Sequence, residues 1–464
     1  MSSPASRLNR REFVRTLASA AALTPAVVAA AGAKPTPTTA RTTPRILLRE
    51  ALQFENIGDS GRVPGTIGLF YQHIPNVEVI LWPWSLHEKE RELLHRTFPK
   101  LKIVDGTMAA DGKASTPALA EAWATANFFV SPDKKAKSYE AWAATGRPFG
   151  LFGSAFDPVT DRKTQPDGAT LDELKAQIDQ LPGGAFDKKF GLRPIYEKAS
   201  FIFCRDTLSL RFLQQQKVRT AQLEFGPEGC FAIAVRDDKR AEAWLRRNQI
   251  KAEDYICVIP RLRHTPYYRV KNLPRSDGDY LLDEINARTT TSDHAPLREM
   301  ITLWVRNTGC KVIACPEMTY QIQTANEQLI DPLPGDVKRH VVWRDTYWLP
   351  DEAASIYARA RAVVSVECHS PIIALANGTP TLHVRQPVDT VKAQMFRDVG
   401  VADWLFEIEK TSGQELWKTL NTIHQDLPAA RRRVRDVMTN VASLQKGMVK
   451  SIERAVLSQA ARTF

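Results

Sequence analysis

The sequence predicts an α/β fold with two successive domains, each built on a parallel sheet. Short apolar runs alternate with helix-like stretches along most of the chain, as in βαβ units. These runs fall into two series, and a polar, helical stretch at 242–254 separates them. About 420 residues remain after the N-terminal segments, which suits two domains of roughly 200 residues each.

The first series of predicted strands begins at 46–48 and continues at 77–81, 102–104, 128–130, 149–152 and 201–204. The second series comprises 255–259, 311–314, 340–342, 362–366 and 381–384. Helices are predicted at 297–307, from the spacing of apolar residues, and at 350–361, where Pro-Asp-Glu is a common helix opening. We therefore expect domains at 45–245 and 246–411, followed by C-terminal helices at 412–464.

The N-terminus predicts export. Arg10 and Arg11 precede Phe13, an alanine-rich apolar run and a small-residue cleavage site at Ala31-Gly-Ala33, which is typical of a twin-arginine signal over residues 1–33. Residues 34–44 are rich in Pro and Thr and read as a disordered linker. We expect the twin-arginine machinery to deliver the folded protein to the periplasm or the extracellular space.

Composition narrows the classes of partner. The formal net charge of +11 falls to +8 once the predicted signal, with its four arginines and one glutamate, is removed. The positive residues are scattered and no nucleic-acid motif accompanies them, which favours an acidic glycan or a small anion over nucleic acid. No later apolar run reaches the roughly 18 residues of a membrane span. The nine histidines form no close ligand-spaced pair and the six cysteines no C-x-x-C pair, so we predict no metal site and favour buried free thiols.

Two motifs follow strands of the first predicted domain. Asn56-Ile-Gly58-Asp59 is a glycine-containing turn where the backbone can approach an anion, although an ordinary turn has the same sequence. Arg205-Asp206 follows the strand that ends at Cys204; Asp206 can cap a helix, and Arg205 can pair with a carboxylate of a ligand or of the protein.

Two further groups follow strands of the second predicted domain. Arg261, Arg263 and Tyr267 lie directly after a strand; arginine binds carboxylates in bidentate fashion and tyrosine can stack on sugars, whereas the alternative is a solvated basic loop. Glu367, His369 and Ser370 follow the strand at 362–366. In an extended segment, residues 367 and 369 share a face, so we expect Glu367 to pair with His369 and raise its pKa. A purely structural pair is the alternative.

The stretch 364–380, with Ser365, His369 and Gly378-Thr-Pro380, resembles the C-terminal signature of the polysaccharide pyruvyl transferase family. Asn56-x-Gly58-Asp59, Arg205-Asp206-x-x-Ser and Gly226-Pro227-Glu228 are similar to other elements of that family, and the resemblance extends from about Asn56 to Trp404. One position departs from the pattern, because Glu367 stands where the family normally has Arg.

The resemblance implies a fold of two Rossmann-like domains facing a cleft, as in glycosyltransferase-B enzymes. It also implies transfer of a pyruvyl group from phosphoenolpyruvate to sugar hydroxyls, with no other cofactor. His369 would be the general acid or base, and cations would bind the carboxylate and phosphate of the donor. The candidates for those cations are Arg205, Arg261, Arg263, Arg385 and Lys392.

Two observations keep other reactions open. Phosphoenolpyruvate is a cytosolic metabolite, and Glu367 would repel its phosphate. An exported member could therefore hydrolyse the pyruvyl ketal of an acidic polysaccharide, with Glu367 and His369 sharing proton transfer. A glycan-binding protein without catalysis and a nucleotide-sugar glycosyltransferase are the remaining alternatives.

Overall fold

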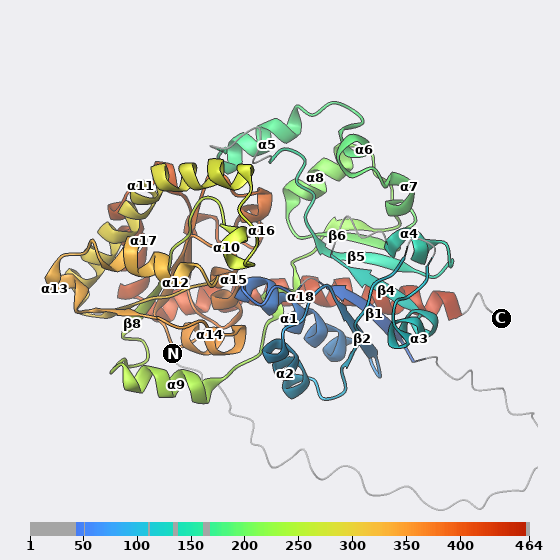
Figure 1. The fold of residues 1–464 in the computed structure, drawn as a ribbon, viewed down its shortest axis with the longest axis horizontal. Coiled ribbons are helices and arrows are strands. Elements are labelled where there is room, and N and C mark those ends of the chain that lie inside the picture. The colour runs from blue at the N-terminus through green and yellow to red at the C-terminus, as the bar shows by residue number, and fades with distance from the viewer. Residues whose placement is uncertain (1–42, 51, 110–111, 133–137, 161–167, 461–464) are drawn as a thin grey trace, which may run out of the picture. The chain divides into compact units, whose positions relative to one another are not determined.

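The computed structural model describes residues 43–50, 52–109, 112–132, 138–160 and 168–460 (Figure 1). The predicted signal at 1–33 and the predicted linker up to residue 42 lie outside these residues. Export therefore stays a prediction.

The first sheet has seven parallel strands in the order β3-β2-β1-β4-β5-β6-β7. Their bounds are β1 Arg45–Glu50, β2 Glu78–Pro83, β3 Lys102–Ile103, β4 Phe128–Ser131, β5 Phe149–Ser154, β6 Phe201–Cys204 and β7 Leu223–Phe225. The strand order reverses between β1 and β4, as in doubly wound folds.

The second sheet has six parallel strands in the order β10-β9-β8-β11-β12-β13, which repeats the topology of the first six strands of the first sheet. Its strands are β8 Tyr255–Ile259, β9 Lys311–Ala314, β10 Val341–Trp343, β11 Ala362–Ser365, β12 Thr381–Arg385 and β13 Leu405–Glu407. The two predicted parallel sheets are confirmed. Of the described strands, only β7 and β13 were not predicted, because each has three residues of which one is a glutamate, whereas the equally short edge strand β10 contains Val341-Val342.

Helices connect the strands. In the first half they are α1 Ile57–His73, α2 Glu88–Thr97, α3 Pro117–Thr125, α4 Ser138–Ala143, α5 Leu171–Asp179, α6 Ala185–Phe190, α7 Arg193–Tyr196, α8 Thr207–Gln215 and α9 Asp238–Arg247. In the second half they are α10 Tyr267–Val270, α11 Asp277–Thr308, α12 Gln321–Thr324, α13 Gly335–Lys338, α14 Pro350–Tyr357, α15 His369–Ala376, α16 Gln394–Asp398, α17 Gly413–Gln425 and α18 Leu427–Ala460. Shorter turns are the 3-10 helices η1 Gly229–Ala232, η3 Val391–Ala393, η4 Ala402–Trp404 and η5 Ile408–Lys410, and the π-helix η2 Ala325–Ile330.

The predicted helix at 297–307 is part of the longer α11, and the helix predicted at 350–361 begins at Pro350 as expected and ends at Tyr357. The predicted domain boundary at residues 245 and 246 falls inside α9. Among the described helices, none combines the length and the apolar character that a membrane span requires.

The last helix packs on the cores of both sheets. Val434 and Val441, in the N-terminal half of α18, belong to the apolar core around the second sheet. Met448 and Ile452, further along the same helix, belong to a core that includes strands of the first sheet. A single helix thus ties the two sheets together (red in Figure 1).

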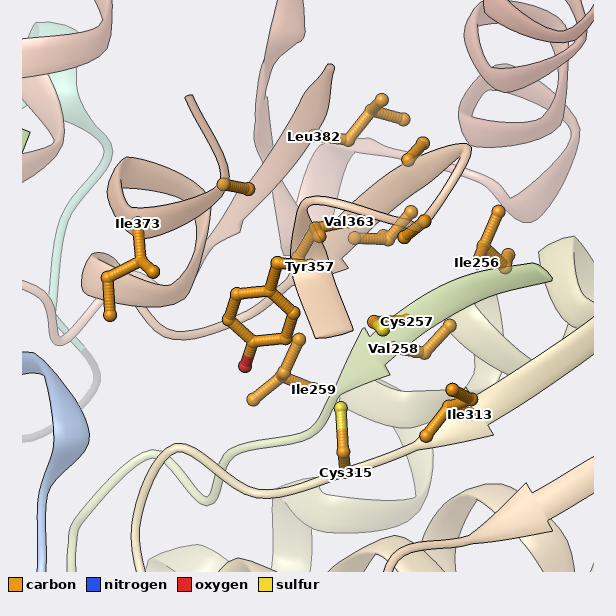
Figure 2. Packing of buried hydrophobic residues seen from close by; sticks show 14 of the residues in the cluster. Ile256, Cys257, Val258, Ile259, Ile313, Cys315, Tyr357, Val363, Ile373 and Leu382 are labelled. Atoms are coloured by element: carbon orange, nitrogen blue, oxygen red, sulfur yellow. The ribbon is translucent and has the colours of Figure 1, made fainter. Parts of the chain in front are cut away.

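The second sheet is buried on both faces. All five residues of β8 are buried, as expected of a parallel sheet covered by helices on each side. Tyr357 from α14 and Ile373 from α15 belong to the same hydrophobic cluster as the strand residues Ile259 and Val363 (Figure 2). All six cysteines are buried and free, which confirms the interpretation of buried thiols.

Candidate active site

Charged side chains of both sheets gather after the carboxyl ends of their strands. Arg261 follows β8 and Glu367 follows β11, the two strands at which the second sheet reverses its order. Arg205 follows β6 and Glu228 follows β7 in the first sheet. In open α/β sheets this edge is where ligands bind.

His369 is the first residue of α15 and lies between two buried carboxylates. Its Nε2 atom is 3.1 Å from Oε1 of Glu228, and its Nδ1 atom is 3.7 Å from Oε1 of Glu317. Burial lowers the pKa of His369, but Glu228 and Glu317 outweigh this effect and raise the pKa from 6.5 to about 9. His369 is therefore an imidazolium at neutral pH.

Each carboxylate has a second partner that holds it in place. Glu228 Oε2 accepts a hydrogen bond from Arg205 at 2.8 Å. Glu317 Oε2 accepts one from the backbone N–H of Ser370 at 2.6 Å. Burial alone would raise the pKa of Glu228, but Arg205 and His369 hold it well below its usual range. Glu228 thus stays ionised at neutral pH.

The expected pairing of Glu367 with His369 is wrong. β11 ends at Ser365, and Cys368 has helical backbone angles (φ −81°, ψ −36°), so residues 367–369 are not an extended segment whose alternate side chains share a face. Glu367 instead lies with its Oε1 3.2 Å from Nε of Arg261 and accepts a hydrogen bond from Gln321 at 2.8 Å.

Asp389 forms ion pairs with two further cations of the cluster, Arg261 and Lys392. The distance from its carboxylate to Nζ of Lys392 is 3.1 Å. Burial would raise the pKa of Asp389, but Arg261 and Lys392 lower it far below its usual value. The side chains of Arg205 and Lys392 keep 14% and 16% exposure, so these two cations remain partly accessible from solvent.

Several polar atoms of the cluster have no hydrogen-bond partner among the described residues. This holds even for some atoms that lie within ion-pair distance of an opposite charge. Nε2 of His369 and Oε1 of Glu228 are two such atoms, because their 3.1 Å contact does not have the geometry of a hydrogen bond. The others are Glu317 Oε1, Arg205 Nε, Arg261 Nε and Asp389 Oδ2. Buried groups of this kind require water or a ligand, and they are candidates for binding one here.

The turn at Asn56 forms a helix cap. Oδ1 of Asn56 accepts hydrogen bonds from the N–H groups of Gly58 and Asp59, at 2.8 and 3.4 Å, and so occupies the position predicted for an anion. Gly58 faces His369, and a Cβ atom on Gly58 would lie 2.4 Å from Cβ of His369. The glycine is needed because α1 packs directly against the imidazole.

Three predicted site residues, Arg263, Arg385 and Tyr267, make their contacts away from His369. Arg263 pairs with Asp293 at 2.8 Å and with Glu409 at 2.6 Å. Arg385 is fully buried, where it pairs with Glu407 and donates to the carbonyl of Asp389, so it supports the loop that carries Asp389. Tyr267 lies on α10 with 39% of its surface exposed.

Ser370 lies beside the cluster, but its side chain faces the core. The hydroxyl of Tyr357 donates to Oγ of Ser370 at 3.1 Å, and only the backbone N–H of Ser370 reaches Glu317. Asp206 caps α8 by accepting a hydrogen bond from the N–H of Ser209, as its position suggested.

Sequence reasoning missed the two partners of His369. Glu317 comes shortly after the predicted strand at 311–314, and this position at a strand end was the available signal. Glu228 ends the Gly226-Pro227-Glu228 motif, but the strand before it, β7, was not predicted. Asp389 lies in the loop after β12, where no pattern marks it.

Comparisons with known proteins identify a similar family and a similar fold. The model of the polysaccharide pyruvyl transferase family matches residues 185–386. A structure of S. aureus MnaA with UDP aligns with a TM-score of 0.50 and 10% identity, covering 89% of this chain and 95% of that one. A Listeria monocytogenes protein assigned as a UDP-N-acetylglucosamine 2-epimerase aligns with a TM-score of 0.51, 10% identity and coverage of 89% and 94%. These structures confirm two Rossmann-like domains of the glycosyltransferase-B type. No curated protein matched the sequence.

Proposed function

We propose that this chain, which the model of the polysaccharide pyruvyl transferase family matches over residues 185–386, is a member of that family and acts on the pyruvyl ketal of a glycan with His369 as the proton donor. The arrangement of His369 supports the proposal. The imidazolium lies between Glu228 and Glu317, and the partly accessible cations Arg205 and Lys392 belong to the same cluster. Such a site offers both an acid and anion-binding groups.

In the transfer reaction, phosphoenolpyruvate would be the donor. The methylene C3 gains a proton, two sugar hydroxyl oxygens add to C2, and the C2–O bond to phosphate breaks. His369 supplies the proton to C3 and regains one from a hydroxyl, while the second hydroxyl proton leaves with phosphate. Arg205 and Lys392 bind the carboxylate and phosphate of the donor.

The charge balance favours a second candidate, ketal hydrolysis. Glu228, Glu317, Glu367 and Asp389 match the four cationic groups of the cluster, which are Arg205, Arg261, Lys392 and protonated His369. A dianionic phosphate finds little excess positive charge there. In hydrolysis, His369 protonates one ketal oxygen, its bond to C2 breaks, and water adds to C2 with loss of a proton. Cleavage of the second C–O bond then releases pyruvate and the two sugar hydroxyls.

Glu367 has a different role in this proposal from the one its sequence position suggested. Since Glu367 lies against Arg261 and Gln321, it positions the Arg261 guanidinium and takes no part in proton transfer with His369. A Glu367→Arg substitution would bury two guanidinium groups together, so Glu367→Gln is the cleaner probe.

The experiment that tests the proposal uses the mature protein, residues 34–464, and its His369→Gln variant. One mixture contains a pyruvylated polysaccharide in water, and the other contains phosphoenolpyruvate with the same polysaccharide after its pyruvyl groups have been removed. Pyruvate released in the first mixture indicates hydrolysis, and glycan-dependent phosphate in the second indicates transfer. Equal glycan affinity of the wild type and the variant, without turnover by either, would contradict the proposed enzymatic activity and favour a glycan-binding protein.

A further inference from the structure

A groove of about 560 Å³ lies beside the site, between α10, the first half of α11 and the segment formed by α12 and η2. Its volume falls in the range of about 300–1,000 Å³ that ligand pockets span. Amide and hydroxyl side chains make up much of its lining: Asn286, Thr290, Thr319, Gln323, Thr324 and Gln328.

One end of the groove lies next to residues of the charged cluster. Leu262, which lines the groove, directly follows Arg261, and Tyr320 lines it as well. Nε2 of Gln321 lies 3.4 Å from the hydroxyl of Tyr320 and 2.8 Å from Oε1 of Glu367. The buried side chain of Gln321 thus connects the groove residue Tyr320 to Glu367 of the cluster.

The two carboxylates that line the groove are both engaged by neighbouring side chains. Asp283 pairs with Arg275 at 2.6 Å and with Arg269 at 3.7 Å, and it accepts a hydrogen bond from the hydroxyl of Tyr268. Glu327 accepts a hydrogen bond from Gln323 at 2.8 Å. The lining thus holds two carboxylates, Asp283 and Glu327, against one cation, Arg269, among neutral donors and acceptors. Such a groove suits a polyhydroxylated, uncharged ligand better than a polyanion, which the two carboxylates would repel.

We propose that this groove binds the uncharged sugar residues that flank the reacting sugar of the polysaccharide. The inference rests on the proposed function for the position of the reacting sugar. It adds a subsite that selects the neutral part of the chain through hydrogen bonds from amides and hydroxyls. The pyruvyl group itself belongs to the cluster around His369.

Filling the groove tests the proposal. Ala287 is an exposed residue of α11 that lines the groove, so Ala287→Trp would fill it without touching the charged cluster. Gln323→Ala would remove one amide of the lining. Ala120→Trp is the matched control, because Ala120 is an exposed residue inside α3 and does not line the groove.

Binding is measured on a printed array of neutral and uronic-acid-containing oligosaccharides. We expect the wild-type protein to bind neutral glycans, with affinity retained in about 0.5 M salt, where surface charges are screened within a few ångströms. Ala287→Trp should weaken this binding about 10-fold or more and Gln323→Ala several-fold, with Ala120→Trp unchanged. Binding of acidic glycans alone, binding of none, or equal binding by Ala287→Trp and wild type would overturn the proposal.

The array separates this inference from the proposed function, because it needs no turnover. If neither reaction occurs but Ala287→Trp still abolishes glycan binding, the groove stands and the catalytic proposal fails. If turnover occurs and the KM for polysaccharide is the same in Ala287→Trp and wild type, the groove fails and the catalytic proposal stands.

Discussion

Two buried histidines of the second half of the chain, His369 on α15 and His383 on β12, have opposite charge states. His369 lies between Glu228 and Glu317, which raise its pKa to about 9 against the effect of burial. His383, on β12, is also buried, and burial lowers its pKa to about 4. Its Nδ1 atom lies 3.2 Å from the carbonyl of Ser365, and its ring stacks on Phe396. Asp389 acts to raise the pKa of His383, but Lys392 and Arg385 oppose it, so the effect of burial prevails. A buried histidine stays charged only where its carboxylate neighbours outweigh burial and the nearby cations.

The charge of His369 depends on both sheets. Glu317 follows β9 of the second sheet, whereas Glu228 follows β7 of the first sheet and is held there by Arg205. His383 has no such contribution from the first sheet among its main interactions. The imidazolium of His369 is therefore a product of the assembled pair of sheets.

The largest expected effect is loss of turnover in His369→Gln. Removal of a general acid typically costs about 10²–10⁴-fold in rate, and glutamine preserves a polar contact with the two carboxylates. The measurement is the rate of pyruvate or phosphate release at saturating glycan. His383→Gln should cost stability but leave the rate of the folded protein unchanged. Comparable rates for His369→Gln and wild type would break the contrast between the two histidines.

The pH dependence of stability should have opposite signs for the two residues. The pKa of His369 is raised on folding from 6.5 to about 9, so its stabilising contribution is complete below pH 6.5 and is lost as pH rises through about 9. The shift corresponds to at most about 3 kcal/mol. The pKa of His383 is lowered to about 4, so stability is lost as pH falls from 6.5 towards 4.

Urea unfolding of wild type and His369→Gln at pH 6 and pH 10 measures the first effect. The difference in free energy of unfolding between the two proteins should shrink at the higher pH. A difference that is independent of pH would show that His369 is not charged by its neighbours.

A smaller effect is expected from the packing of α1 on His369. A Cβ atom at Gly58 would lie 2.4 Å from His369, so Gly58→Ala should destabilise the protein by about 1–3 kcal/mol and lower turnover. Gly68 lies in the same helix, and a Cβ atom there would face open space, so Gly68→Ala should be neutral or stabilise by up to about 1 kcal/mol. Thermal unfolding of the two variants provides the comparison, and equal losses would contradict it.

The smallest expected effect is a displacement of the pH–rate profile. Glu228→Gln removes the carboxylate that contributes most to the raised pKa of His369, so the alkaline limb should move down by about one pH unit or more. Glu367→Gln should leave that limb in place, because Glu367 faces Arg261. If the alkaline limb of the pH–rate profile moves in Glu367→Gln but not in Glu228→Gln, the result would support the pairing of Glu367 with His369 that the sequence suggested.

Strands were predictable where both faces of a sheet are covered. β8, β9 and β11 are short, almost wholly apolar runs with polar residues at their carboxyl ends, and each appears close to its predicted bounds. β7 and β13 each have a glutamate among only three residues, so they lack a continuous apolar run, whereas the edge strand β10 contains two adjacent valines and was predicted. Their pairing comes from neighbouring strands and not from their own sequences.

The candidate site was partly predictable because several of its residues directly follow predicted strands. Arg205, Arg261 and His369 follow predicted strands, and parallel strands place their carboxyl ends along one edge. The backbone between residues 365 and 369 was not predictable, because Ser365 bonds to both backbone groups of Glu367 and ends the extended run. Glu367 and His369 consequently face different partners.

The sequence by itself determined the two parallel sheets, the buried thiols and the chemical types that gather at the strand ends, because apolar patterning and strand polarity are local properties. Tertiary structure alone decided which charges meet. Glu228 and His369 are 141 positions apart by their residue numbers and follow strands of different sheets, yet Oε1 of Glu228 and Nε2 of His369 lie 3.1 Å apart. Ion pairing falls steeply with distance, so the charge state of His369 exists only once the two sheets have packed together.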